Sequence, residues 1–328
     1  MSYNSGKTLA CALFLIVGAC SLDPQRVLLA QPRSSLGGQP APAFRFGFGA
    51  IGPGMGNAVS ALPSSASAGY YNPALTAFLD HPYASATLGL LTLDRNLNFV
   101  GYARRLPPKA GISFGVINAG VGDIQGRDRD GRPTEIYSTS ENAFVFSFGL
   151  KPNEWMAIGL SPKIFYYSLY EDVSSTTVGF DVGVMMRLHP QWSVGAVIHD
   201  ISSKYRWDTS PLYGNSGNSM TDRFPLRRKL SLGYEHAQIG LMAGAEFEYI
   251  GSLPIVRLGA NMTLAEQFQI RAGIDQLTWK ENLLPRISLG FSFESSYETW
   301  RPGISYAFVH DPYGSGGMHF VSLSVRFE

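Results

Sequence analysis

The sequence predicts an all-β protein: a transmembrane antiparallel β-barrel of about 14 strands with an N-terminal plug, or hatch, in its lumen. Three observations lead to this prediction. Short segments of alternating apolar and polar residues recur from residue 83 to the end of the chain. The connections between these segments alternate in length. A stretch rich in glycine and alanine, residues 44–82, precedes the first segment and is too poor in large side chains to build a core of its own.

The first 30 residues predict a signal peptide. Lys7 precedes an apolar run, residues 9–20, which has the length of a signal-peptide core and is too short to span a bilayer as a helix. Two cleavage sites fit this leader. We favour an ordinary site after Ala30, because a barrel needs no lipid anchor; the alternative is a lipoprotein signal that ends before Cys20. The remaining chain divides into a linker (31–43), the hatch (44–82) and the barrel (83–328).

Composition supports export and excludes several classes of protein. Both cysteines, Cys11 and Cys20, lie in the leader, so the mature chain has no disulfide framework and no cysteine-based metal site. The net charge is +1, which gives no electrostatic footprint for nucleic acid. An exported, nearly neutral chain with 36 glycines suits the outer membrane of a Gram-negative type of cell, with membrane lipid as its surroundings.

Alternation with a period of two is the main evidence for strands. In residues 286–294, for example, Ile287, Leu289, Phe291 and Phe293 alternate with polar residues and glycine. Most of the alternating segments have the roughly 9–11 residues that a tilted strand needs to cross a bilayer. We expect strands near 84–93, 95–104, 109–120, 142–151, 154–168, 173–188, 191–204, 225–236, 238–250, 254–263, 266–276, 283–294, 299–309 and 317–328.

The connections sort by their order in the chain. Every second connection is short, whereas the third and seventh, residues 121–141 and 205–224, are long. Bacterial barrels have short periplasmic turns and longer outer loops. This order of lengths therefore predicts which end of the barrel faces the periplasm and which faces the outside. Trp155, Trp192 and Trp300 flank three of the short turns, as expected of an aromatic belt at the membrane interface.

If the apolar faces of the strands meet lipid, the opposite faces place charges of both signs in the lumen. The balance favours a charge-paired interior that holds a plug over an open, ion-selective pore. The expected luminal charges are Lys163, Arg187, Lys229, Arg257, Arg271, Arg286, Arg326, Asp181, Glu235, Glu246, Glu248, Asp275 and Glu294.

The small-residue segment resembles the hatch of FadL-like outer-membrane proteins, and is closest to their PorV/PorQ branch. The resemblance rests on Gly52-x-Gly54-Met55-Gly56-Asn57-Ala58 and Tyr70-Tyr71-Asn72-Pro73-Ala74, and on a second stretch from Gly122 to Ala143. It covers the chain from about residue 44 to the end and implies a 14-stranded barrel. The chain departs from the pattern at Leu75, where glycine is common after Asn-Pro-Ala, and at Glu328, which follows the terminal Phe327.

The hatch residues have physical roles of their own. Glycine permits backbone approaches that a side chain forbids, and Asn72 before Pro73 favours extended or turn geometry and can cap backbone groups. Irregular backbone at membrane depth needs burial in protein, which the lumen provides. Both a hatch that moves and one that is purely structural fit these residues. The expected hatch and gating residues are Gly52, Gly54, Gly56, Asn57, Asn72, Pro73 and Ala74.

Catalytic and metal patterns are weak. Residues 47–52 match GxGxxG without a strand–helix unit, and Asp128-Arg129-Asp130-Gly131 lacks calcium ligands at the first and last positions of the loop. The six histidines have no metal-binding spacing. We therefore expect no enzyme, no metal site and no cofactor.

Two functions follow from the resemblance. PorV/PorQ-type proteins act in type IX-like protein secretion or surface attachment, and this first interpretation implies secreted proteins or secretion subunits as partners. The alternative is a FadL-like channel that takes up hydrophobic small molecules through a hatch-gated lateral opening. It requires an apolar pocket beside the hatch, for which Phe44, Phe46, Phe48 and Phe78 are the candidates.

Overall fold

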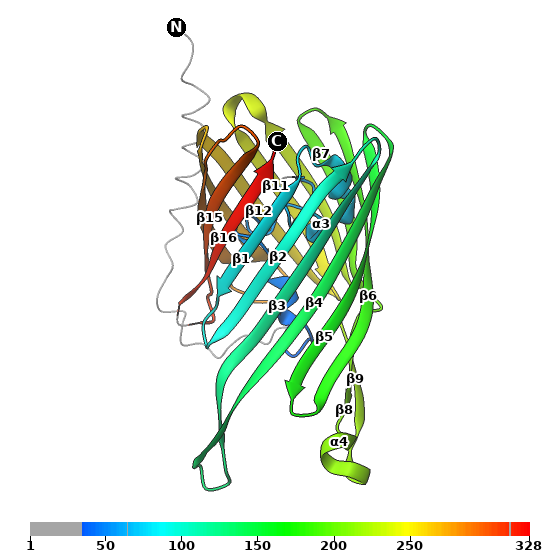
Figure 1. Ribbon diagram of the computed structural model, residues 1–328, viewed down its shortest axis with the longest axis vertical. Coiled ribbons are helices and arrows are strands. Elements are labelled where there is room, and N and C mark those ends of the chain that lie inside the picture. The colour runs from blue at the N-terminus through cyan, green and yellow to red at the C-terminus, as the bar shows by residue number, and fades with distance from the viewer. Residues whose placement is uncertain (1–34, 64, 315) are drawn as a thin grey trace.

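The computed structural model describes residues 35–63, 65–314 and 316–328, so the expected signal peptide lies outside the described residues. A closed antiparallel barrel of 14 strands surrounds the hatch (Figure 1). The barrel strands are β1 (Tyr83–Leu90), β2 (Arg95–Leu106), β3 (Ala110–Arg127), β4 (Pro133–Asn153), β5 (Met156–Tyr170), β6 (Val173–His189), β7 (Trp192–Ile201), β10 (Arg227–His236), β11 (Leu241–Ile250), β12 (Leu253–Ala265), β13 (Phe268–Leu277), β14 (Arg286–Glu294), β15 (Trp300–His310) and β16 (Gly317–Phe327).

Each barrel strand pairs with its neighbours in the chain, except that β7 pairs with β10 and the ring closes between β1 and β16. Tyr83 stands opposite Arg326, so the first and last strands begin and end at the same rim. The short turns lie at this rim, which we assign to the periplasm. No helix among the described residues is long and apolar enough to cross a membrane.

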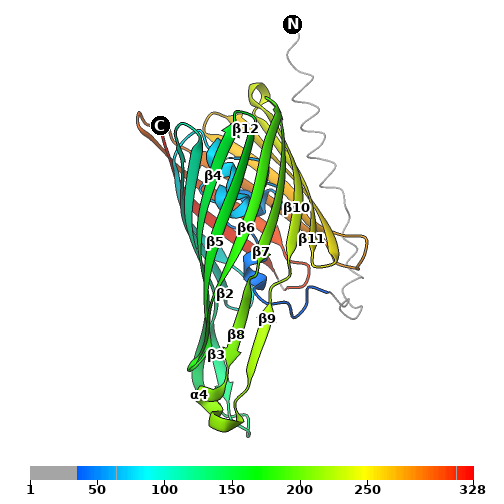
Figure 2. The same ribbon diagram turned by 90° about the vertical axis from the view of Figure 1, so that its right-hand side faces the viewer.

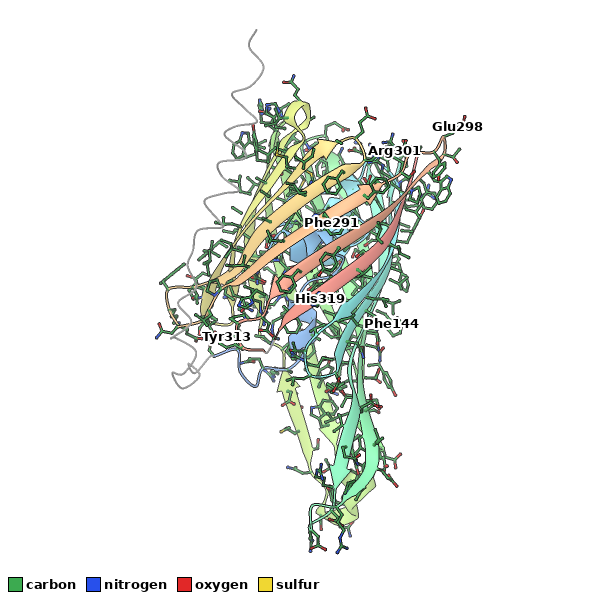
Figure 3. All side chains as sticks on the ribbon, turned by 90° about the vertical axis from the view of Figure 1, so that its left-hand side faces the viewer. Phe144, Phe291, Glu298, Arg301, Tyr313 and His319 are labelled. Atoms are coloured by element: carbon green, nitrogen blue, oxygen red, sulfur yellow. The ribbon has the colours of Figure 1, made fainter. Side chains whose placement is uncertain are left out.

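The side chains alternate as the sequence predicts. Along β4, buried and exposed residues follow one another from Ala143 to Leu150. The exposed positions are apolar: Phe144 and Phe291 are 42% and 44% exposed and point outward from the wall (Figure 3). Antiparallel strands with one face on lipid need this pattern, because water is absent outside the barrel. The protein is thus an outer-membrane β-barrel. Trp155, Trp192 and Trp300 lie exposed at the periplasmic end, as predicted.

The two long connections differ from the expected loops. Strands β3 and β4 continue through most of 121–141 and form a hairpin far beyond the barrel, whereas 205–224 contains a second hairpin (Figure 2). Lipid does not touch these extensions, so their exposed faces mix polar residues with isolated apolar ones such as Ile136 and Met220, and they lack the regular apolar alternation that predicts strands. The second hairpin consists of β8 (Lys204–Asp208), α4 (Ser210–Tyr213), η4 (Gly214–Ser216) and β9 (Ser219–Arg223); one further short helix, η5 (Ala237–Ile239), forms the turn after β10.

The hatch lies inside the barrel as a chain of short helical turns, of which α3 is visible through the wall in Figure 1. Its Ala50, Met55, Ala74 and Leu75 are each 0% exposed, although none of its helices exceeds six residues. Small residues let a chain this irregular fill the lumen, and the barrel keeps its backbone from lipid. The hatch helices are η2 (Pro42–Arg45), α2 (Ile51–Gly54), α3 (Ala68–Tyr71) and η3 (Pro73–Phe78).

Candidate functional site

A belt of strand glycines receives the hatch. On nine neighbouring strands, from β3 to β13, an inward glycine lies so close to the hatch that an added Cβ would meet it at 1.8–2.9 Å. At Gly244, for example, that Cβ would be 1.8 Å from the carbonyl oxygen of Ala58, and at Gly159 it would be 2.4 Å from the amide nitrogen of Ala74. The glycine belt consists of Gly111, Gly149, Gly159, Gly183, Gly195, Gly233, Gly244, Gly259 and Gly273.

The belt is continuous along two parts of the wall, because its members stand opposite one another in the strand register. Gly111, Gly149, Gly159 and Gly183 form one run of direct pairs. The second run contains Gly233, Gly244, Gly259 and Gly273. Backbone of the hatch therefore packs directly against backbone of the wall over most of the circumference.

The three glycines expected in the hatch are also tightly enclosed. A Cβ at Gly52 would lie 1.8 Å from the hydroxyl of Tyr71, and one at Gly56 would lie 2.7 Å from the backbone of Ile274. At Gly54 it would meet the side chain of Arg271 at 2.7 Å. These positions exclude side chains, so Gly52 sets the fold of the hatch itself and Gly54 and Gly56 set its fit to the wall.

Asn57 and Asn72 connect the hatch through their amides. Asn57 donates to the carbonyl of Phe46 and to Asp275 at 3.0 Å each, and accepts from Tyr71. Asn72 caps η3 by accepting from the amide of Ala74 at 3.0 Å, next to Pro73. Its Nδ2 donates to the carbonyls of Ser60 and Val184 at 3.0 and 3.1 Å. Asn72 thus joins two hatch segments and β6.

We expect Asn72→Ala to destabilise the protein by about 1–3 kcal/mol, because it removes a cap and leaves buried carbonyl groups without donors. Thermal unfolding in detergent, followed by the heat-dependent shift in gel mobility, measures the loss. Asn98→Ala is the control, since among the described residues the side chain of Asn98 makes one long hydrogen bond, of 3.4 Å to Asn118. Equal stability of the two variants would contradict the structural role of Asn72.

A buried ion network fills the wall that carries the belt. Lys163 binds Asp181 at 2.7 Å and Asp200 at 3.1 Å. Arg257 binds Asp275 at 2.5 Å and also pairs with Glu248. A separate pair, Lys229 and Glu246 at 3.0 Å, contacts Ser60 of the hatch. Of the thirteen luminal charges expected from sequence, these pairs confirm Lys163, Lys229, Arg257, Asp181, Glu246, Glu248 and Asp275.

Three members of this network were missed. Arg227 pairs with Asp200 and Glu248 at 3.5 and 3.3 Å and donates to the carbonyl of Phe44. His199 is fully buried with its Nδ1 2.8 Å from Asp181. Asp200 follows it at the end of β7. The alternation of β7 and β10 places Arg227 and His199 inward, so counting every polar inward residue would have found these two.

A cavity of about 490 Å³ lies at the extracellular end of the barrel, between the start of the hatch and strands β2–β6, under the β8–β9 hairpin. We call it the outer cavity. Its volume falls in the range typical of small-molecule sites. Apolar and aromatic side chains dominate its lining, among them Phe46, Leu97, Ala119, Tyr167, Tyr205 and Trp207.

Several polar groups of the outer cavity bond neighbouring side chains or backbone, whereas the Oδ1 of Asn96 has no hydrogen-bond partner among the described residues. Tyr205 donates to Glu141 at 2.5 Å, and the indole of Trp207 donates to Asp222 at 2.8 Å. Arg95 donates to Thr92 at 2.8 and 3.1 Å. Burial and the charge of Glu141 raise the pKa of the Tyr205 phenol, which therefore remains a donor at neutral pH. The cavity consequently offers a mainly apolar surface.

The structure places three of the four expected pocket phenylalanines together. Phe46 lines the outer cavity, and Phe44 and Phe48 belong to the same buried cluster. The expectation for Phe78 is wrong: it ends η3 in a second cluster, with Lys151 and Arg187 4.7 and 5.1 Å from its ring centre. The helical turn after Pro73 carries Phe78 toward the periplasmic end, away from Phe46.

The segment before the hatch takes part in the site. Residues 35–43, the described part of the expected linker, lie against the barrel, and Pro40, Ala41, Pro42 and Ala43 line the outer cavity. Ala41 is only 4% exposed. Among the described residues, no group of three or more histidine, cysteine, aspartate or glutamate side chains could hold a metal ion.

These features define a plugged outer-membrane barrel with an apolar cavity. The fold is similar to that of the toluene transporter TodX of Pseudomonas putida, with TM-score 0.60, 12% identity, and coverage of 86% of this chain and 97% of that one. It also resembles the CymD monoaromatic hydrocarbon channel (0.58, 14%, 86% and 97%) and a Pseudomonas aeruginosa FadL homologue (0.58, 14%, 85% and 97%). No protein-family model and no curated protein sequence matches the chain. The chain therefore has the FadL-like fold.

Proposed function

We propose that the protein is a channel that takes up small hydrophobic molecules across the outer membrane, with the outer cavity as the site where they first bind. The observation that carries this proposal is the outer cavity, whose charged side chains Arg95, Glu141 and Asp222 hydrogen-bond neutral protein groups and leave a mainly apolar, aromatic lining. Binding there is favourable for an apolar molecule by about 25 cal/mol for each Å² of its apolar surface that leaves water.

The structural neighbours support transport over secretion. The proteins of similar fold are a toluene transporter, a monoaromatic hydrocarbon channel and a FadL homologue. Under the secretion interpretation, the PorV/PorQ resemblance would make the two extracellular hairpins surfaces for protein partners. The apolar cavity has no role in that interpretation, and we therefore take transport as the function.

We propose that the hatch controls passage. Every neighbouring pair of barrel strands is joined by hydrogen bonds in the part of the chain that the structure describes, so the wall is closed in this conformation. Uptake then requires either separation of strands, as the lateral opening implies, or movement of the hatch. Four of the expected gating residues lie against the wall, and in this proposal they anchor the hatch and do not move. They are Gly54, Gly56, Asn72 and Ala74.

We expect Ala119→Trp to reduce binding and uptake of toluene about tenfold, because the indole would occupy the outer cavity beside Leu97. Binding is measured by displacement of the apolar dye N-phenyl-1-naphthylamine from purified protein, and uptake in proteoliposomes. Val100→Trp is the matched control, since Val100 is 59% exposed on the lipid face.

Undiminished binding in Ala119→Trp would contradict the proposal. Co-purification of secreted proteins in fixed stoichiometry from the native membrane, together with absence of dye binding in the unaltered protein, would instead favour the secretion interpretation.

A further inference from the structure

A second, smaller cavity lies on the periplasmic side of the hatch. It measures about 40 Å³ and lies between Gly49, Ala50, Ser65 and Ser67 of the hatch and strands β1, β14, β15 and β16. We call it the inner cavity. Its strand side chains are mainly hydroxyls and charges: Ser85, Glu294, Arg301, Ser305, Ser322 and Ser324. This composition contrasts with the apolar lining of the outer cavity.

The strand register gives the order of the two cavities along the barrel. Leu97, which lines the outer cavity, pairs with Gly89. Four residues further along β2, Gly101 pairs with Ser85, which lines the inner cavity. Phe99 lies between these two levels, opposite Thr87, which in turn faces Ser322. The outer cavity therefore lies on the extracellular side of Phe99, and the inner cavity begins at the level of Phe99, where Ser322 lines it.

Phe48 of the hatch occupies this level. Its ring centre is 5.8 Å from that of Phe99 and 4.6 Å from that of Tyr70, and the side chain is 1% exposed. Two residues later, the amide of Ala50 donates to Ser322 at 2.8 Å, which fixes the hatch at the same height. The ring of Phe48 thus lies between the two cavities.

The backbone around Phe48 is suited to a turn. Gly47 and Gly49 both have left-handed backbone, with φ of 90° and 75°. Only glycine adopts such angles without strain, so Phe48 stands between two positions of high conformational freedom. The amide of Phe48 donates to the hydroxyl of Tyr71 at 3.0 Å, and this bond holds the closed position.

The rest of the hatch has its own anchors around the lumen. The glycine belt and the ion network both lie on strands between β3 and β13. Residues 47–50 contact β2 and β16 through Phe99 and Ser322, and α2 directly after them packs against β14 and β15. Movement of residues 47–50 alone would leave these anchors in place.

We infer that Phe48 is the gate of this channel: rotation about Gly47 and Gly49 withdraws its ring and joins the outer cavity to the inner cavity, which leads to the periplasm along β1, β15 and β16. This inference rests on the proposed function. It assigns passage to a single side chain and a serine-lined route, and it requires neither release of the whole hatch nor separation of strands.

Removal of the ring tests the gate. We expect Phe48→Ala to raise the flux of toluene into proteoliposomes, and the conductance of planar bilayers, at least tenfold. Phe165→Ala is the matched control, because Phe165 is also 1% exposed but lies on β5, three strands from Phe99, and contacts Phe44 of the hatch and Tyr205 of β8. Equal flux in both variants, or no increase in Phe48→Ala, would overturn the inference. A heat-dependent shift in gel mobility equal to that of the unaltered protein shows that each barrel is folded.

A reversible lock tests the movement. A Cβ built on Gly49 would be 3.9 Å from the Cβ of Ser67, within the range of disulfides. In the double variant Gly49→Cys, Ser67→Cys, we expect oxidation to stop toluene flux and reduction to restore it; the reduced double variant is the reference, because cysteine at position 49 carries the strain of its left-handed backbone. Flux that persists in the oxidised protein would overturn the inference. Dye binding separates the two proposals. If the unaltered protein does not bind the dye, the outer cavity is refuted as a binding site. If it binds the dye but toluene flux responds neither to Phe48→Ala nor to oxidation of the double variant, only the gate is refuted.

Discussion

Replacing Gly244 with alanine is expected to destabilise the protein by about 2–3 kcal/mol and to displace the hatch. The added methyl group would lie 1.8 Å from the carbonyl oxygen of Ala58, a backbone atom that cannot turn aside. Overpacked sites typically cost about 1–3 kcal/mol, because neighbouring backbone must shift. Thermal unfolding and bilayer conductance measure the two effects.

Gly122→Ala is the control for the belt. Gly122 lies in β3 with no atom within 4 Å of a built Cβ, so the same chemical change meets open space. We expect its stability to remain within about 0.5 kcal/mol of the unaltered protein. Equal destabilisation of both variants would show that close packing on the belt is not what positions the hatch.

Replacing Glu248 with glutamine is expected to cost about 3 kcal/mol. Glu248 is 1% exposed and pairs with both Arg227 and Arg257, so its neutralisation leaves two buried guanidinium groups with fewer counter-charges. Breaking a buried pair by removing one partner typically costs about 3–5 kcal/mol. The unfolding midpoint in detergent, measured against denaturant, gives the size of the loss.

Asp130→Asn provides the comparison for this charge. Asp130 lies 4.0 Å from Arg132 at the tip of the β3–β4 hairpin, and both side chains are more than 70% exposed. Exposed pairs contribute about 0–1 kcal/mol, so the unfolding midpoint should barely change. A loss in Glu248→Gln no larger than in Asp130→Asn would contradict a network that supports the hatch.

The barrel could be predicted from sequence because lipid imposes its chemistry on every strand. Outward residues such as Phe291 must be apolar and their neighbours need not be, which produces a period of two that is visible in the sequence. Beyond the membrane this constraint ends. The hairpin of β8 and β9 was therefore missed. β3 and β4 are also longer than the segments of apolar alternation that predicted them.

The site was only partly predictable. The small residues of the hatch identified a lumen plug, and Asn57 and Asn72 stand out as buried connectors. The glycine belt was missed because each glycine, such as Gly159, looks like an ordinary strand residue; its meaning appears only when neighbouring strands are in register. The position of Phe78 depends on the direction of the helical turn after Pro73, which the spacing of residues does not give.

The closure between β1 and β16 has a consequence for biogenesis. β1 follows the hatch directly, and its partner β16 is the last of the fourteen barrel strands along the chain, so the ring cannot close until all of these strands have been exported. Once closed, the wall offers no side entrance for a folded plug, while the belt glycines admit the hatch backbone only at contact distance. We therefore expect the hatch to be enclosed during assembly, with the barrel forming around it as a template.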